Sequence, residues 1–369
     1  MEYDTFDDAA FSLPRFIEDV YNGPSAKNRS SVMKRILGMF VCAAMLGLAS
    51  PGNAQTLASV KARGILNCGA NPGLGGFALP DAQGNWAGLD VDFCRAVAAA
   101  IFDDPKKVKF VPLTAKDRFT ALQSGEIDVL VRNTSWTSSR DTALGLNFTG
   151  VNYYDGQGFM VLKALKVKSA LELSDAAVCV GQGTTTELNL ADYFRGNKMK
   201  LKTVTFATND ETVKAYEAGR CDVFTADRSG LYGERLRFAK PDDHDVLPEI
   251  ISKEPLGPSV RHGDDQWFDI VKWVHYAMLN AEEAGVTSKN IDEALKSENP
   301  DIKKLVGTEG NYGEQLGLTK DWLVRIVRHV GNYGESFERN VGEGSPLKIS
   351  RGLNALWNKG GLQYAPPIR

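Results

Sequence analysis

The sequence has little of what nucleic-acid-binding and membrane-spanning chains share. Its 369 residues carry a formal net charge of −3, and no cluster of Lys and Arg resembles a surface that follows a phosphate backbone. The apolar run from Ile36 to Leu48 is too short to cross a bilayer as a helix. We therefore expect no nucleic-acid partner.

Patterns typical of catalysis and of metal or cofactor binding are also missing. The four histidines, His244, His262, His275 and His329, are scattered and show no catalytic spacing to Ser, Cys or Asp. The cysteine spacings fit no zinc motif. Gly73–Ala78 has the glycine pattern of a dinucleotide-binding loop, but a turn-forming segment follows it where that motif requires a helix. We expect no enzyme activity, no metal and no cofactor.

Residues 33–54 have the organisation of a secretory signal peptide. Basic Lys34-Arg35 precedes the apolar run, and small residues occupy the cleavage positions, so the mature chain is expected to start near Gln55. Residues 1–32 are interpreted as an over-extended N-terminus, with Met33 as the true initiator. The alternative is a genuine cytosolic extension or membrane anchor.

Four cysteines remain after the expected cleavage, namely Cys68, Cys94, Cys179 and Cys221. An even number of cysteines in an exported chain favours disulfides. We expect Cys68 to pair with Cys94 in one lobe and Cys179 with Cys221 in the other. Four free buried thiols are the alternative.

Two lobes are expected because 369 residues exceed what one hydrophobic core usually holds. The composition, 43% hydrophobic and 24% charged, is that of a soluble globular protein. The first half of the mature chain alternates between strands and helices, with Asp90 expected as a helix N-cap. The expected elements are strand 65–68, helix 92–102, strand 108–111, helix 116–123 and strand 127–131. This β-α-β-α-β order indicates an open parallel sheet, whose ligands bind at the carboxyl ends of the strands.

A second series of the same kind follows. Its expected elements are strand 177–180, a helix from Glu187, strand 202–206, helix 209–217 and a strand from Cys221 that ends at Asp227. Crossovers near 153–158 and 255–258 separate the series, and helices are expected near 265–283 and 321–330. The predicted fold is α/β, with two open, mostly parallel sheets joined by two hinge crossovers. Lobe 1 would comprise residues 55–154 and 256–369, including a C-terminal extension beyond about residue 300, and lobe 2 residues 155–255.

Two polar segments at predicted strand ends form candidate half-sites. Asn133, Ser135 and Arg140 follow the strand at 127–131, and an arginine can bind a carboxylate through two parallel hydrogen bonds. In the second series, the backbone N–H groups of Thr184 and Thr185 at a helix start suit an anion, and Asp227 suits an ammonium. A plain capping box at Thr184 and an N-cap role for Asp227 are the structural alternatives. Together the groups outline the polar atoms of a free amino acid.

Several segments then resemble a known family. They are residues 88–94, 121–129, 134–140, 183–187, 218–222, 226–227 and 351–357. The chain resembles the periplasmic amino-acid-binding proteins of ABC transporters (type II periplasmic binding proteins), in particular their general L-amino-acid-binding branch, over residues 56–369. The resemblance implies a periplasmic protein that captures L-amino acids and delivers them to permease subunits at the inner membrane. A sensing module or a dehydratase-like enzyme on the same fold is the alternative.

The resemblance also implies roles for individual residues. Arg140 would bind the ligand α-carboxylate, helped by the backbone of Ser135 and Thr185. Asp227 would bind the α-ammonium, together with the Asn133 carbonyl and the Ser135 hydroxyl. Thr184 and Thr185 would close the site from the second lobe.

The walls of the pocket are expected to be less aromatic and less charged than in narrow-specificity relatives. Leu74 and Ala115 stand where those relatives carry aromatic rings, and Asn71 where they often carry an aspartate. Phe77 is a further candidate, with a core position beside the pocket as its alternative. This composition predicts broad specificity.

Overall fold

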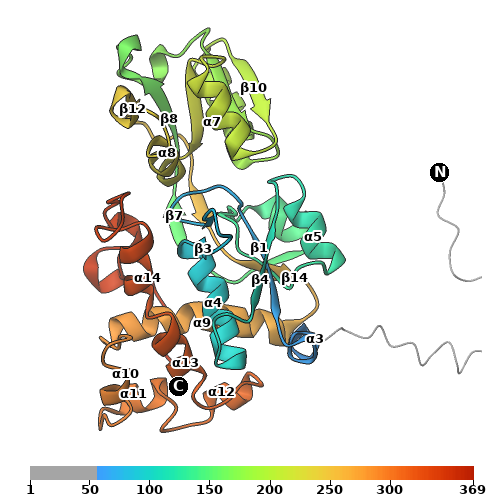
Figure 1. The fold of residues 1–369 in the computed structure, drawn as a ribbon, viewed down its shortest axis with the longest axis vertical. Helices are drawn as coiled ribbons and strands as arrows, with labels where there is room; N and C mark the ends of the chain where they lie inside the picture. The colour runs from blue at the N-terminus through green and yellow to red at the C-terminus, as the bar shows by residue number, and fades with distance from the viewer. Residues whose placement is uncertain (1–55) are drawn as a thin grey trace, which may run out of the picture. The chain divides into compact units, whose positions relative to one another are not determined.

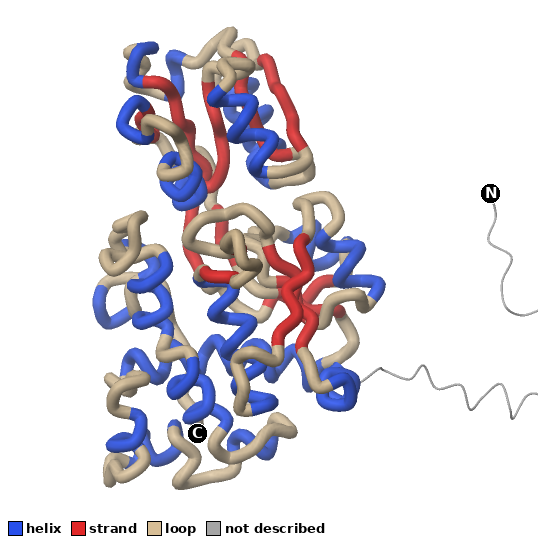
Figure 2. The backbone as a smooth tube through the Cα atoms, in the orientation of Figure 1, coloured by secondary structure: helices blue, strands red, loops and turns tan. Residues whose placement is uncertain are grey.

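The computed structural model describes residues 56–369, so the predicted signal peptide and residues 1–32 lie outside the described residues. Two five-stranded sheets organise this part of the chain (Figures 1 and 2). The first has the order β4-β1-β5-β14-β6, with bounds Val108–Pro112, Leu66–Ala70, Val129–Leu130, Ser259–Arg261 and Leu146–Phe148. β1 pairs in parallel with β4 and β5, whereas β14 pairs antiparallel with β5 and β6.

The second sheet has the order β10-β9-β11-β8-β12, with bounds Lys202–Phe206, Ala177–Gly181, Val223–Asp227, Gln157–Leu162 and His244–Val246. β9 is parallel to β10 and β11, and β8 is antiparallel to β11 and β12. The predicted fold class, two open and mostly parallel sheets, is confirmed. We call the parts built on the first and second sheets lobe 1 and lobe 2.

Two short strands carry the chain between the lobes. β7 (Tyr153–Asp155) and β13 (Glu254–Leu256) pair antiparallel, with Glu254 opposite Asp155. β2 (Leu79–Pro80) and β3 (Trp86–Ala87) form a separate small hairpin in lobe 1. The antiparallel pair of β7 and β13 is the hinge that the sequence predicted.

Helices cover both sheets. Those of lobe 1 are α3 (Thr56–Arg63), α4 (Leu89–Phe102), α5 (Arg118–Ser124), α9 (Asp265–Glu283), α10 (Ile291–Ala294), α11 (Pro300–Leu305), α12 (Tyr312–Gln315), α13 (Trp322–His329) and α14 (Tyr333–Asn340). Those of lobe 2 are α6 (Thr185–Gly196), α7 (Asn209–Glu217) and α8 (Arg228–Arg235). The main core lies where α4, α9 and α13 meet, and Trp267 anchors it by donating its indole N–H to the Asp128 carbonyl, at 2.9 Å.

Helix α4 begins earlier than predicted, which corrects the role of Asp90. The N-cap is Gly88, whose φ of 137° a residue with a Cβ would adopt only under strain. Asp90 lies inside the first turn and is buried, where its Oδ2 accepts a hydrogen bond from the backbone N–H of Asn133, at 2.8 Å. Its side chain therefore fixes the loop after β5 instead of capping the helix.

Both expected disulfides are present. Cys68–Cys94 joins β1 to α4, and Cys179–Cys221 joins β9 to the residues just before β11. Each disulfide links a strand to a neighbouring segment within one lobe, so the lobes are cross-linked separately.

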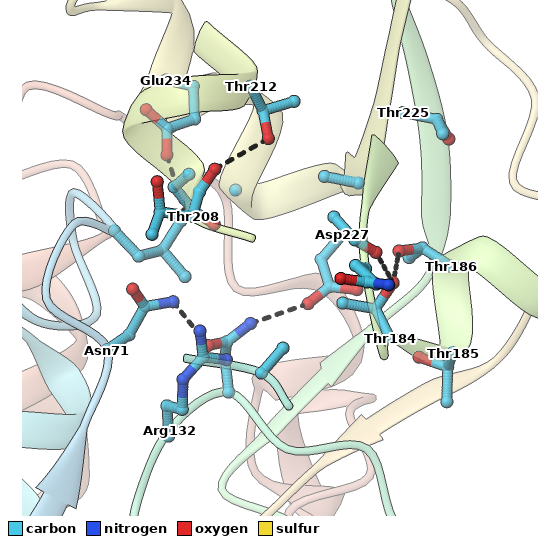
Figure 3. Close-up of a pocket in the computed structure, with 18 of the residues that line it drawn as sticks. Asn71, Arg132, Thr184, Thr185, Thr186, Thr208, Thr212, Thr225, Asp227 and Glu234 are labelled. Carbon is cyan, nitrogen blue, oxygen red and sulfur yellow. Dashed lines mark hydrogen bonds between the residues drawn. The ribbon is translucent and has the colours of Figure 1, made fainter. Parts of the chain in front are cut away.

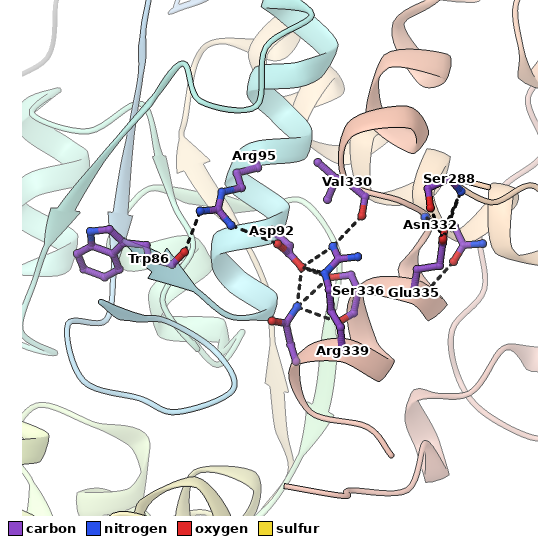
Figure 4. Close-up of polar contacts among 10 residues, drawn as sticks. Trp86, Asp92, Arg95, Ser288, Val330, Asn332, Glu335, Ser336 and Arg339 are labelled. Atoms are coloured by element: carbon purple, nitrogen blue, oxygen red, sulfur yellow. Dashed lines mark hydrogen bonds and ion pairs between the residues drawn. The ribbon is translucent and has the colours of Figure 1, made fainter. Parts of the chain in front are cut away.

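The C-terminal extension packs onto α4 of lobe 1. Its two Gly-Asn-Tyr-Gly-Glu copies start α12 and α14, and Asn332 forms a capping box with Glu335 in the second. The buried carboxylate of Asp92 accepts hydrogen bonds from Ser336 Oγ, at 2.9 Å, and Arg339 Nε, at 2.8 Å (Figure 4). Asp92 thus holds the extension to the lobe.

The same extension reaches the backbone at β7. Gln363 Nε2 donates to the Val151 carbonyl at 3.1 Å, and Tyr333 Oη donates to the Asn152 carbonyl at 2.8 Å. The side-chain amide of Asn354 accepts from the Tyr154 N–H at 2.7 Å and donates to its carbonyl at 3.0 Å. One crossover strand is therefore bonded to β13 along one edge and to tail side chains along the other.

Candidate ligand-binding site

A cavity lies between the lobes at the carboxyl ends of β1, β5, β9 and β11 (Figure 3). This is the edge at which an open α/β sheet places its ligands. The sequence-predicted residues that line the cavity are Asn71, Leu74, Ala115, Asn133, Ser135, Thr184, Thr185 and Asp227. Two predicted residues, Arg140 and Phe77, are not among the lining residues.

Asp227 ends β11 as a buried carboxylate in the cavity wall. Burial, followed by the nearby charges of Asp155 and Glu254, raises its pKa well above the ordinary aspartate range. Its hydrogen-bond donor from lobe 1 is the neutral amide of Asn133, 3.2 Å away. A cation bound here would favour the ionised form, so the site suits an ammonium group.

Asn133 is held in place from two sides. Its φ of 33° lies in the left-handed region, which Asn tolerates better than most residues. Its Oδ1 accepts a hydrogen bond from Asn71 Nδ2 at 3.0 Å, and its backbone N–H donates to Asp90. The loop that carries Asn133 and Ser135 is thereby pre-organised at the cavity edge.

Three buried arginines surround the cavity. Arg118 and Arg132 line it, whereas Arg140, in the short π-helix Ser139–Ala143, lies beside it. Arg140 Nη1 donates to the Ser135 carbonyl at 2.8 Å, and its guanidinium lies over the Phe119 ring, 5.2 Å from the centroid.

Arg118 is one of the cavity-lining residues that sequence reasoning missed. It starts α5, and its buried Nε has no hydrogen-bond partner within residues 56–369. Burial lowers the pKa of Arg118, and the positive charges of Arg140 and Arg132 lower it further. A carboxylate would pair the unpartnered donor and relieve this repulsion. The only sequence signal was its position in the first turn after β4, at the carboxyl edge of the sheet.

On the lobe 2 side, Thr184 both caps helix α6 and lines the cavity. Its Oγ1 accepts from the Glu187 N–H at 3.1 Å and donates to the Gly181 carbonyl at 2.7 Å. Thr185 Oγ1 instead lies 3.3 Å from Ser135 Oγ of lobe 1. The two lobes therefore meet at the hydroxyls predicted to close the site.

The far wall of the cavity is polar and comes from lobe 2, including Thr208 and Glu234 (Figure 3). Asn209 of lobe 2 also lines the cavity. Burial raises the pKa of Glu234 to about 7, and the ion pair with Arg237, at 2.8 Å, offsets this only in part. Phe77 packs in the core with its ring edge-on to Tyr153, 5.1 Å between centroids. Among the described residues that line the cavity, Phe224 is the one aromatic side chain, so no aromatic pair encloses it there.

Within residues 56–369, His, Cys, Asp and Glu side chains form no group of three that could hold a metal ion. None of the helices in that part of the chain is long and apolar enough to cross a bilayer.

The sequence matches the family model of the bacterial extracellular solute-binding proteins, family 3, over residues 66–293. It is 64% identical over 338 residues to the general L-amino acid-binding periplasmic protein AapJ of Rhizobium johnstonii, covering 91% of this chain and 99% of the relative. It is 55% identical over 323 residues to the glutamate/glutamine/aspartate/asparagine-binding protein BztA of Rhodobacter capsulatus, covering 87% and 96%.

A solved structure of a periplasmic binding protein also matches this chain. A Brucella ovis ABC transporter/periplasmic binding protein with glutathione bound is 63% identical and has a TM-score of 0.84, covering 86% of this chain and 100% of that one. The family match spans both sheets and the cavity between them, and the relatives are named for solute binding and not for catalysis. The chain therefore belongs to family 3 of the bacterial extracellular solute-binding proteins.

Proposed function

We propose that this protein captures free L-amino acids of several side-chain classes between its lobes and delivers them to an ABC permease. The main observation behind the proposal is that a buried acid, Asp227, and buried arginines line the same cavity. Such a cavity matches the two charges of a zwitterion. The names of the relatives, for a general L-amino-acid binder and for a binder of acidic residues and their amides, support the same ligand class.

In this proposal the α-ammonium binds Asp227, the Asn133 carbonyl and the Ser135 hydroxyl. The α-carboxylate binds Arg140 and the backbone N–H of Thr185, and Arg118 supplies a second guanidinium nearby. Charge-assisted hydrogen bonds contribute roughly 1.5–3 kcal/mol each. About four of them supply the ~8 kcal/mol of micromolar binding after the costs of closure and ordering.

Broad specificity follows from the side-chain end of the cavity. Leu74 and Ala115 offer no ring to stack against, and the Thr208, Asn209 and Glu234 wall offers both donors and acceptors. Glutathione, present in the Brucella ovis structure, carries an amino-acid head on a longer body. We include it as a candidate ligand.

The remaining proposals concern export and partners. Residues 33–54 direct the chain to the periplasm, and the mature protein starts near Gln55. Lobe 1 comprises residues 55–154 and 256–369, and lobe 2 residues 155–255. Permease subunits at the inner membrane bind the ligand-closed form, because closure brings the rims of both lobes together.

A thermal-shift screen against the twenty amino acids and glutathione tests the proposal, because a ligand that binds only the folded state raises its melting temperature. We expect shifts for several amino acids, confirmed as micromolar binding by calorimetry. No shift with any of them would refute amino-acid capture, and a shift with glutathione alone would replace it with peptide capture.

A further inference from the structure

Glu254 lies behind the cavity, in the hinge strand β13, and is buried at 1% exposure. It is not a lining residue, whereas Ser135 and Thr185, which contact it, both are. Its Oε2 accepts hydrogen bonds from Ser135 Oγ of lobe 1 and from Thr185 Oγ1 of lobe 2, the latter at 2.8 Å. One carboxylate oxygen therefore binds a hydroxyl from each side of the cleft.

The other oxygen is occupied as well. Glu254 Oε1 accepts from Asn189 Nδ2 and from Ser252 Oγ, both at 2.7 Å. An ionised carboxylate has about four lone-pair sites and no hydrogen to donate. Four donors therefore match the ionised side chain.

This arrangement fixes the direction of the two cavity hydroxyls. Ser135 Oγ and Thr185 Oγ1 also lie 3.3 Å apart, but Glu254 Oε2 is closer to each of them, so both hydroxyls donate to the carboxylate. A hydroxyl has one hydrogen and two lone pairs, so Ser135 and Thr185, when they donate to Glu254, can only accept toward the cavity. Beside the Asp227 carboxylate and the Asn133 carbonyl, both proposed above as ammonium partners, these two hydroxyls then add acceptors and no donor. An ammonium has three N–H donors, whereas a hydroxyl at the same carbon has one.

We propose that Glu254 is the positioning residue of the ligand site. By drawing both hydroxyl hydrogens away from the cavity, it makes Ser135 and Thr185 acceptors and so sets the preference for α-amino over α-hydroxy acids. The inference rests on the proposed capture of amino acids and deepens it, because it assigns discrimination to a residue that does not touch the ligand.

The test is Glu254→Gln, which replaces one acceptor oxygen with an N–H₂ donor. Asn189 Nδ2 can only donate, so the Gln oxygen keeps the place of Oε1 and the N–H₂ takes the place of Oε2, beside the two cavity hydroxyls. At least one of these hydroxyls then accepts from Gln and turns its own hydrogen into the cavity, where it opposes an ammonium but can bind a hydroxyl oxygen. Calorimetry would compare L-glutamate with L-2-hydroxyglutarate, and L-alanine with L-lactate. We expect the amino-to-hydroxy affinity ratio to fall at least tenfold.

Glu249→Gln is the matched control, since Glu249 also accepts from a serine hydroxyl (Ser169, at 2.6 Å) but does not line or back the cavity. Its affinity ratio should equal that of the wild type. A folded Glu254→Gln variant with the wild-type ratio overturns the inference, even if both affinities fall, because a purely structural role would weaken both ligands alike.

If Glu254→Gln does not fold, Thr185→Val is the second test of the inference. It removes one acceptor for the ligand ammonium and leaves the carboxylate of Glu254 in place. A lower amino-to-hydroxy ratio supports the inference, and an unchanged ratio overturns it. A wild-type protein that binds none of the twenty amino acids refutes amino-acid capture itself, and this outcome is distinct from normal wild-type binding with an unchanged ratio in the variants.

Discussion

Asn133 and Asp227 face each other across the cleft, and Asn133 Nδ2 donates a hydrogen bond to Asp227 Oδ2 at 3.2 Å. The bond joins the end of a lobe 1 strand to the end of a lobe 2 strand. A single neutral amide compensates little of the cost of burying a carboxylate. The ionised Asp227 thus destabilises the ligand-free folded protein, and an ammonium ligand would offset this cost.

The first prediction concerns this residue. Asp227→Asn should weaken α-amino acids by at least ~2 kcal/mol, about 30-fold in Kd, because the ammonium exchanges an ionised partner for a neutral amide. The α-hydroxy analogues should lose less. Urea denaturation of the ligand-free variant at pH 7 should show a higher free energy of unfolding, since a buried acid with a raised pKa no longer has to ionise. Equal losses for both ligand classes would contradict the ammonium role.

The second prediction compares two arginines. Arg140→Gln and Arg118→Gln should each reduce amino-acid affinity by at least ~2 kcal/mol, because a bound carboxylate would lose a cationic partner while still buried. Calorimetry measures the loss. Arg195→Gln is the control, since its side chain is 78% exposed on α6. Full affinity in Arg118→Gln would limit carboxylate binding to Arg140.

The third prediction is a substitution that should stabilise a helix but hinder closure of the two lobes. A Cβ at Gly233, inside α8, would lie 2.8 Å from the Gly75 carbonyl oxygen of lobe 1. Gly233→Ala should therefore oppose close approach of the lobes and lower amino-acid affinity at least tenfold. In the open form, where the lobes are apart and the Cβ does not meet Gly75, the same change should raise the free energy of unfolding by about 0.5–1 kcal/mol, the usual gain from Ala in a helix.

Gly196→Ala serves as its control. Gly196 ends α6, and a Cβ there meets nothing within 4 Å, so the substitution should leave affinity unchanged. Wild-type affinity in Gly233→Ala would show that binding does not require the contact between residues 75 and 233.

The fourth prediction is a pH dependence. The pKa of Glu234 is about 7 in the folded protein against 4.5 unfolded, so the folded state holds this proton more tightly. Its contribution to stability is full below pH 4.5 and is lost as the pH rises toward 7. Between pH 5 and 8 the wild type should lose up to about 3 kcal/mol more than Glu234→Gln in urea denaturation. Parallel pH profiles would show that Glu234 titrates normally.

Elements with a strong local pattern could be predicted from the sequence. The bounds of β10, α7 and α9 agree with those expected, and both cysteine pairs formed as predicted. Helix α6 starts two residues early because Thr184 provides its cap. The helices and strands are decided by interactions close in sequence. The even cysteine count predicts disulfides, and the expectation of one pair in each lobe gave their partners.

Residues that act through tertiary contacts could not be found in this way. Arg118 belongs to a predicted helix, and its position after β4 places it near the carboxyl edge of the sheet but does not indicate that its guanidinium would be buried at the cavity. Glu254 lies in a three-residue strand and binds partners 119 and 69 residues away. Such roles depend on how distant segments meet, which periodicity does not encode.

Asn354, Tyr333 and Gln363 bind the backbone around the hinge strand β7. The C-terminal extension therefore stiffens the hinge. Any rotation of one lobe against the other has to bend a strand whose outer edge is already bonded. The balance between open and shut forms is then set in part far from the bound solute. Removing the residues after 350 would make the hinge more flexible and would leave every proposed ligand-binding residue in place.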